Sequence, residues 1–185
     1  ILLPGTKNTI SDLIWLRESG LEPAILRKTE FDHIPVIGIC GGYQMLGEQL
    51  SDPDGVEGEK GRSIRGMGLL PARTVFEQRK TRGQTEVVLQ RNTGMLEKCA
   101  VGARMTGYEI HMGITELTGK AEPVFARNPD QDDHLSHPDH QIYQNQPSQI
   151  LSMSNQNWEG LAREDGLVLG TYLHGLFDNE ELTAA

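Results

Sequence analysis

The stretch that decides the fold is Pro35-Val36-Ile37-Gly38-Ile39-Cys40-Gly41-Gly42-Tyr43-Gln44-Met45-Leu46. The apolar run before Cys40 predicts a buried strand. The residues after the two glycines predict a helix with Tyr43, Leu46 and Leu50 on its apolar face. A side chain at such a strand-to-helix turn projects from the edge of the sheet, and small neighbours let substrate and backbone approach it closely. The stretch is therefore typical of a nucleophile elbow that carries a reactive thiol.

The position of Cys40 at the start of the predicted helix favours a reactive thiolate. The helix dipole and the free N–H groups stabilise the charged form, so we expect a thiol pKa below the ~8.5 of a free cysteine. The alternative is a buried structural cysteine in a parallel strand, which is the commoner role of a lone cysteine. Gly41 and Gly42 favour the reactive interpretation, because a cysteine that only packs does not require them.

Composition narrows the classes of function. The 185 residues suffice for one domain with a sizeable core, and 37% hydrophobic residues with 21 glycines indicate many tight turns and polar loops. The formal net charge of −9 argues against nucleic acid and anionic membrane surfaces as partners. No apolar run approaches the length of a membrane span. Cys40 and Cys99 form no disulfide framework, which is typical of a reducing cytoplasm.

The first third of the chain predicts an α/β sheet. A strand that ends at Pro4-Gly5 precedes helices over residues 8–20 and 23–32, and the strand and elbow follow. Asn8 or Thr9 can cap the first helix. In such sheets the ligand site lies at the carboxyl ends of parallel strands, where residues 4–6 and Cys40 would emerge.

The rest of the chain predicts mainly β structure. Residues 51–63 have no apolar period and indicate a loop. The strands that we expect, antiparallel because no crossover helices separate them, cover residues 74–76, 85–89 and 104–117. A hairpin turn at residues 165–166 then leads to a buried strand over 167–173, which delivers His174.

Residues 122–148 differ from the rest of the sequence because they are crowded with Asp, His, Gln, Asn and Pro. We interpret them as a polar surface insertion. Three histidines lie in it: His134, His137 and His140. No rigid strand or helix is predicted to fix their geometry, so we expect a solvated loop and no metal site.

A cysteine at an elbow and a histidine at the end of another strand suggest a Cys-His pair. His174 would accept the thiol proton, the Cys40 thiolate would attack a carbonyl, and the imidazolium would return the proton to the leaving group. Backbone N–H groups of Gly41 and of Gly5 or Thr6 would stabilise the oxyanion.

Three motifs resemble one known family. They are residues 38–47 (GICGGYQMLG), 107–113 (GYEIHMG) and 170–179 (GTYLHGLFDN), and they are supported by residues 3–9, 52–58 and 68–71. Together they are similar to the CobB/CobQ-type class I glutamine amidotransferases, and within that family to the amidotransferase domain of cobyric acid synthases. The resemblance covers nearly all of the chain except the polar insertion.

The resemblance implies a fold and an activity. The fold would be class I amidotransferase-like, or flavodoxin-like: a mostly parallel sheet flanked by helices, with an antiparallel β extension. Cys40 would be the nucleophile and His174 the base in glutamine hydrolysis through a γ-glutamyl thioester. By similarity, Gln44 would help to hold the glutamine, and Tyr108 and Glu109 would lie near it.

The resemblance also implies a partner domain. In this family an N-terminal synthetase domain uses ATP and Mg²⁺ to amidate adenosylcobyrinic acid a,c-diamide with the released ammonia. Residues 1–185 contain no Gly-x-x-x-x-Gly-Lys-Ser/Thr loop, and Ile1-Leu2-Leu3 resembles the end of a strand. We therefore expect a fragment that lacks its first strands and the synthetase domain, and a domain without a cofactor of its own.

One position departs from the wider pattern of class I enzymes. Many of them carry His-x-Glu, whose glutamate orients the imidazole, whereas here Leu176 stands two residues after His174. Glu109 and Asp178 are the candidates for that role. Two alternative functions stay open: an amidotransferase that makes cobyrinic acid a,c-diamide or acts on lipid II, and an α/β binding module without catalysis.

Overall fold

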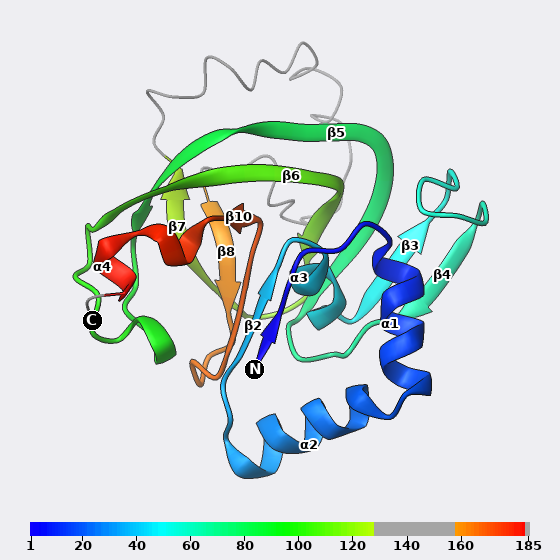
Figure 1. The fold of residues 1–185 in the computed structure, drawn as a ribbon, viewed down its shortest axis with the longest axis horizontal. Coiled ribbons are helices and arrows are strands. Elements are labelled where there is room, and N and C mark those ends of the chain that lie inside the picture. The colour runs from blue at the N-terminus through cyan, green and yellow to red at the C-terminus, as the bar shows by residue number, and fades with distance from the viewer. Residues whose placement is uncertain (128–157, 184–185) are drawn as a thin grey trace.

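One mixed β-sheet organises the protein in this computed structural model, which describes residues 1–127 and 158–183. Eight of its strands follow the order β1-β2-β9-β8-β7-β5-β3-β4, while β6 pairs with β5 and β10 (Figure 1). The strands are β1 Leu2–Leu3, β2 Val36–Ile39, β3 Gln49–Asp52, β4 Arg62–Arg65, β5 Ala72–Leu89, β6 Arg104–Leu117, β7 Glu122–Arg127, β8 Trp158–Ala162, β9 Val168–Thr171 and β10 Leu173–His174. The α-helices are α1 Thr9–Glu18, α2 Leu21–Asp32, α3 Gly41–Leu46 and α4 Glu180–Thr183, and short 3₁₀ helices cover Gly94–Leu96 and Leu176–Asp178.

The parallel part of the sheet carries the elbow. Strand β2 lies between β1 and β9 and is parallel to both, with Leu3 opposite Gly38 and Ile39 opposite Thr171. Strands β8 and β7 continue the sheet with antiparallel pairings and join this part to β5. The predicted α/β class is thus confirmed, but the sheet is mixed and not mostly parallel: among the described strands, only β1–β2, β2–β9 and β3–β5 pair in parallel.

Two hydrophobic clusters fill the two sides of the sheet. Alternation along β9 shows the division, since Val168 packs in the cluster with the helices and Leu169 in the other. The first cluster joins Ile10 and Leu13 of α1 to Tyr43 and Leu46 of α3, among others. The second includes Val87, Met105, Phe125, Leu173 and Leu176.

The boundaries of α1 and α2 agree with the predicted ones to within two residues, but α3 ends at Leu46, and Leu50, which was expected on its apolar face, lies in β3. Asn8 caps α1 by accepting a hydrogen bond from the Ser11 N–H at 2.9 Å. Gly20, at φ 81°, separates α1 from α2 in the left-handed region that glycine adopts without strain. Helix α2 starts at Leu21, so Pro23 lies in its first turn and does not begin it.

Several predicted boundaries are wrong. The strands expected at residues 74–76 and 85–89 form the single strand β5. The stretch 51–63 is not all loop, because β3 extends to Asp52 and β4 begins at Arg62, and the two strands form an antiparallel pair. The polar insertion does not begin at residue 122, because residues 122–127 form strand β7, whose Val124 and Phe125 are completely buried. The remainder of that stretch, with its three histidines, lies outside the described residues.

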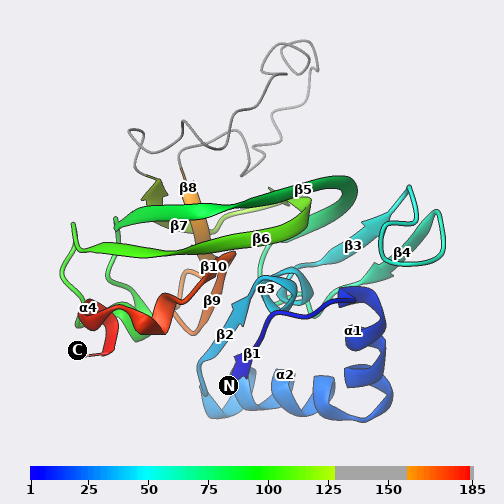
Figure 2. The ribbon, with the colours of Figure 1, turned by 45° about the horizontal axis from the view of Figure 1, so that its top comes forward.

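Strands β5 and β6 form a long antiparallel pair that runs beside the rest of the sheet (Figure 2). The side chains of β6 alternate between solvent and interior. Tyr108 and Ile110 are 55% and 42% exposed, whereas Glu109 is fully buried and the His111 side chain is 10% exposed. At the β10 end, Tyr108 is the register partner of His174.

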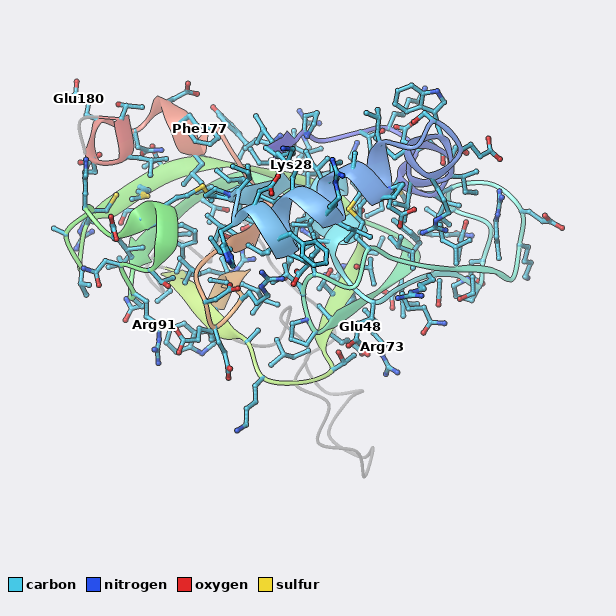
Figure 3. The ribbon with its side chains drawn as sticks, turned by 90° about the horizontal axis from the view of Figure 1, so that it is seen from below. Lys28, Glu48, Arg73, Arg91, Phe177 and Glu180 are labelled. Atoms are coloured by element: carbon cyan, nitrogen blue, oxygen red, sulfur yellow. The ribbon has the colours of Figure 1, made fainter. Side chains whose placement is uncertain are left out.

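The outer surface carries charges of both signs. Figure 3 labels Glu48 and Arg73, which lie beside each other where β3 pairs with β5. Arg73 forms an ion pair with Glu116 at 2.8 Å, and Glu48 accepts a hydrogen bond from Thr118 at 2.9 Å. Among the helices of the described residues, none is long and apolar enough to cross a membrane.

Candidate active site

Cys40 occupies a strained turn between β2 and α3. Its backbone angles are φ 53° and ψ −112°, a region that non-glycine residues avoid at a cost of about 1–3 kcal/mol. Its N–H donates to the Thr171 carbonyl at 2.8 Å, which ties the turn to β9. The thiol donates to the Ile110 carbonyl of β6, with Sγ and O 3.4 Å apart. This is the geometry of the predicted nucleophile elbow.

The prediction of a lowered thiol pKa is wrong for this resting state. Burial raises the pKa of the Cys40 thiol, and the negative charge of Glu57 raises it further, while a hydrogen bond from the Gly41 N–H lowers it. The side chain is only 7% exposed, and α3 has six residues, so desolvation outweighs what the helix end contributes. The thiol therefore needs a base to become nucleophilic at neutral pH.

The loop after β1 packs directly onto the elbow. A methyl group at Gly42 would overlap the Leu3 carbonyl, and one at Gly41 would lie 3.2 Å from the Thr6 backbone nitrogen. The absence of side chains at these two positions thus allows the loop to reach the elbow. The Thr6 hydroxyl is anchored by donating to the Asp12 carboxylate. The predicted oxyanion donors, Gly41 and the loop of Gly5 and Thr6, are neighbours in space.

His174 lies against the same loop, beside Cys40. A methyl group at Gly5 would stand 2.9 Å from His174 Cε1 and 3.5 Å from Cys40 Cβ, so Gly5 lies against both predicted catalytic residues. Burial lowers the pKa of His174, and the nearby His111 lowers it further. The neutral imidazole that results can accept a proton. Its Nε2 is buried and has no hydrogen-bond partner among the described residues.

Gln44 is buried behind the elbow, and its side-chain amide is fully engaged. The amide nitrogen donates to the Met112 carbonyl at 2.9 Å and to the Tyr172 hydroxyl at 3.2 Å. The amide oxygen accepts from the Thr9 hydroxyl at 3.0 Å. In this arrangement Gln44 ties α3 to β6, α1 and Tyr172, and its predicted contact with glutamine stays a prediction.

Glu109 faces away from Tyr108 and into a buried network. Its carboxylate pairs with Arg127, at 2.5 and 3.1 Å, and lies 3.6 Å from His111 Nε2. Burial works against ionisation, yet His111 and Arg127 together lower the pKa of Glu109. His111 stacks on Tyr172 with ring centroids 3.7 Å apart.

Neither carboxylate proposed to orient the base reaches its ring. The contacts of Glu109 are with Arg127 and His111, and Asp178 is exposed, with Oδ2 near the α-carbon of Gly175. Among the described residues, no carboxylate is hydrogen-bonded to His174, so the structure holds no His-Glu or His-Asp pair of the usual kind there.

Two carboxylates near the site were not predicted from the sequence. Glu57 accepts from the Ile10 N–H at 2.9 Å, and its other oxygen lies 3.0 Å from the Thr9 hydroxyl, whose single proton is shared with Gln44; burial raises the pKa of Glu57. Glu159 of β8 accepts hydrogen bonds from the Tyr172 N–H and the Thr171 hydroxyl, just before His174. A signal for Glu57 was present, since it lies in the 52–58 motif, whereas no pattern around Glu159 marks it as buried.

No metal centre emerges from the part of the chain that the structure describes, because it contains no group of three or more His, Cys, Asp or Glu side chains arranged to hold an ion.

Comparison with known proteins decides the family. The model of the CobB/CobQ-like glutamine amidotransferase domain matches residues 1–182. The chain belongs to this family. This CobB/CobQ-like domain is 44% identical over 180 residues to a cobyric acid synthase of Lachnoclostridium phytofermentans, covering 97% of the chain and 31% of that protein. It is 38% identical to a cobyric acid synthase of Citrobacter koseri, covering 100% of the chain and 31% of that protein.

Solved structures show the same fold at lower similarity. A crystal structure of a glutamine amidotransferase aligns with a TM-score of 0.54 at 14% identity, covering 99% of the chain and 74% of that structure. The structure of PurLQS from Thermotoga maritima aligns with a TM-score of 0.56 at 14% identity, covering 89% of the chain and 65% of that structure. The CobB/CobQ-like domain is thus a glutamine amidotransferase with a class I amidotransferase fold.

Proposed function

We propose that this domain hydrolyses glutamine through a Cys40 thioester and supplies the ammonia to a corrinoid amidation in cobalamin biosynthesis. The observation that carries the proposal is the meeting of Cys40 and His174 around Gly5, with the Gly41 and Thr6 backbones adjacent. A strained thiol, a neutral imidazole and two neighbouring amide groups are the components that acyl transfer from an amide requires.

The proposed reaction has two stages. His174 takes the proton of Cys40, and the thiolate attacks the γ-carbonyl carbon of glutamine while N–H groups of Gly41 and of Gly5 or Thr6 bind the oxyanion. The imidazolium then protonates the departing nitrogen, which is released as ammonia. The γ-glutamyl group stays bound to Cys40 as a thioester. Water, deprotonated by His174, cleaves the thioester to glutamate and restores the thiol.

The three residues expected to bind glutamine are proposed to act in different ways. Tyr108, exposed and paired in register with His174, would contact the glutamine at the rim of the site. Gln44 would hold the floor of the site through its bonds to Tyr172 and Met112. Glu109 would act from behind, through His111.

The acceptor of the ammonia is proposed from the relatives. The chain spans about 31% of the cobyric acid synthases that it matches. By analogy, a synthetase domain beyond this chain would bind ATP and Mg²⁺ and activate the carboxylates of adenosylcobyrinic acid a,c-diamide. The amidotransferase domain itself needs no cofactor for the proposed hydrolysis.

Covalent labelling tests the glutaminase half of the proposal. 6-Diazo-5-oxo-norleucine, a glutamine analogue that alkylates a thiol with loss of N₂, should attach to Cys40, and glutamine should protect the thiol. Peptide mass spectrometry locates the adduct. A folded protein that stays unlabelled, and that releases no glutamate from glutamine, would support a binding module without catalysis.

Amidation by the whole protein tests the acceptor. The full-length enzyme, incubated with ATP, Mg²⁺, glutamine and adenosylcobyrinic acid a,c-diamide, should form amides whose nitrogen comes from amide-¹⁵N glutamine. Cobyrinic acid and lipid II serve as competing acceptors. Amidation of either one in preference to the diamide would reject the proposed substrate and leave the glutaminase assignment standing.

A further inference from the structure

A buried carboxylate on β8 holds the segment that carries the predicted base. Glu159 is 1% exposed, and its two oxygens accept separate hydrogen bonds. Oε1 accepts from the Tyr172 N–H at 2.6 Å, and Oε2 accepts from the Thr171 hydroxyl at 2.7 Å. The Thr171 hydroxyl in turn accepts from the Leu173 N–H at 3.0 Å. Glu159 thus fixes the three residues that precede His174.

The same segment also fixes the nucleophile. The carbonyl of Thr171 accepts the Cys40 N–H at 2.8 Å, at the point where the strained turn leaves β2. Since the carbonyl and hydroxyl belong to one residue, the Glu159 carboxylate influences both the elbow and the turn into β10.

We propose that Glu159 is the positioning residue of the glutaminase site, which holds His174 and Cys40 in register through the Thr171–Leu173 backbone. This inference rests on the proposed function of the Cys-His pair. Where a triad glutamate would bind the imidazole directly, Glu159 acts one step away, on the chain that bears the imidazole.

The surroundings of Glu159 make ionisation of its carboxyl group unfavourable. Burial raises the pKa of Glu159 to about 7, the Glu109 carboxylate contributes to the rise, and Arg127 opposes it. The Tyr43 phenol also feels the charge of Glu159. A side chain kept only for packing gains nothing from a carboxylate here, whereas the ionised form offers acceptors to both donors at once.

Glu159→Gln tests the inference. Glutamine has nearly the same shape but only one side-chain oxygen, so either the Tyr172 N–H or the Thr171 hydroxyl loses its acceptor. We expect kcat for glutamine hydrolysis to fall about 10- to 100-fold, with KM changed less than about threefold, because misplacement by ~1 Å is expensive in catalysis. The measurement is steady-state kinetics on protein whose folded fraction is verified by circular dichroism.

Thermal unfolding separates positioning from structural support. The pKa of Glu159 is higher in the folded protein than the ordinary 4.5, so its protonated form contributes stability at low pH that is lost as the pH rises through about 7. The variant cannot ionise, so its Tm relative to wild type should increase between pH 5 and pH 8. At pH 8, where this linkage no longer favours the wild type, a positioning role predicts lost turnover without a matching loss of Tm, whereas a purely structural role predicts that turnover falls only as far as Tm does.

Two substitutions at Thr171 complete the test. Thr171→Ser keeps the hydroxyl and should retain turnover within about threefold. Thr171→Val has a similar size but removes the hydroxyl, so Glu159 Oε2 and the Leu173 N–H each lose a hydrogen-bond partner, and this variant should resemble Glu159→Gln. Wild-type turnover by the folded Glu159→Gln protein would overturn the inference. A wild-type protein that is neither labelled at Cys40 nor active would instead reject the proposed function itself.

Discussion

Replacing Cys40 with serine should reduce glutamine hydrolysis by at least about 10⁴-fold, because in hydrolases that use a nucleophile and a base as a unit, loss of the nucleophile removes nearly all of the rate. A serine hydroxyl at this buried turn would be far harder to deprotonate than the thiol, which already has a raised pKa. The fold should persist, since the two side chains have similar shape. Glutamate release, followed with a coupled dehydrogenase, measures the effect.

Cys99→Ser is the matched control. Cys99 is also buried, at 3% exposure, but it lies in the second hydrophobic cluster, and its thiol donates to the Glu181 carbonyl at 3.4 Å. Its replacement should leave turnover per folded molecule within about twofold, as expected for a group outside the active site. Comparable losses in the two variants would show that the thiol of Cys40 has no special role.

Gly5→Ala should reduce turnover by about 10²- to 10³-fold, the usual effect of losing an oxyanion donor. The new methyl group would stand 2.9 Å from His174 Cε1, which is closer than carbon atoms approach one another. Either the imidazole or the loop with its N–H groups must then move. Because Gly5 does not have a positive φ, alanine at this position would cause a steric overlap but no backbone strain.

Gly119→Ala provides the comparison for Gly5→Ala. Gly119 is exposed, has an ordinary φ, and a methyl group there would contact only Pro71, at 3.1 Å. Turnover and Tm should be measured for both variants. Gly5→Ala should lose turnover with only a small change in Tm, whereas Gly119→Ala should change neither turnover nor Tm by much. Full activity of the Gly5 variant would contradict the position assigned to this loop.

The positions of the Cys40 turn, of His174 and of the loop at residues 5–6 could be predicted because each follows a local pattern, and their catalytic roles stay predictions. An apolar run followed by Cys40 and two glycines specifies a strand, a turn and a helix, and the strand before His174 has the same kind of local signal. The cap at Asn8 follows from the same short-range logic. That residues 4–6 and Cys40 emerge at one edge of the sheet followed from the parallel-strand rule, whereas the order of the strands was not predicted.

The rest depended on tertiary contacts that no local pattern reports. Strand β7 carries Glu122 and Pro123 at its start and merges with a polar stretch, so its two buried residues gave too short a signal. The thiol pKa was predicted in the wrong direction because desolvation by the surrounding chain outweighed the helix end. Glu159 resembles an ordinary surface glutamate in sequence, and only its contacts with Thr171 and Tyr172 distinguish it.

The alternation along β6 separates two kinds of evolutionary freedom within one strand. Glu109 and His111 belong to a buried network. Replacing one partner would leave a buried charge or ring nitrogen of the other without a hydrogen bond. Tyr108 and Ile110 point outward beside the predicted base and can vary singly at little expense to folding. Neighbouring positions of this strand can therefore diverge at different rates: the exposed residues that would contact substrate can change, while the buried residues beneath them are constrained.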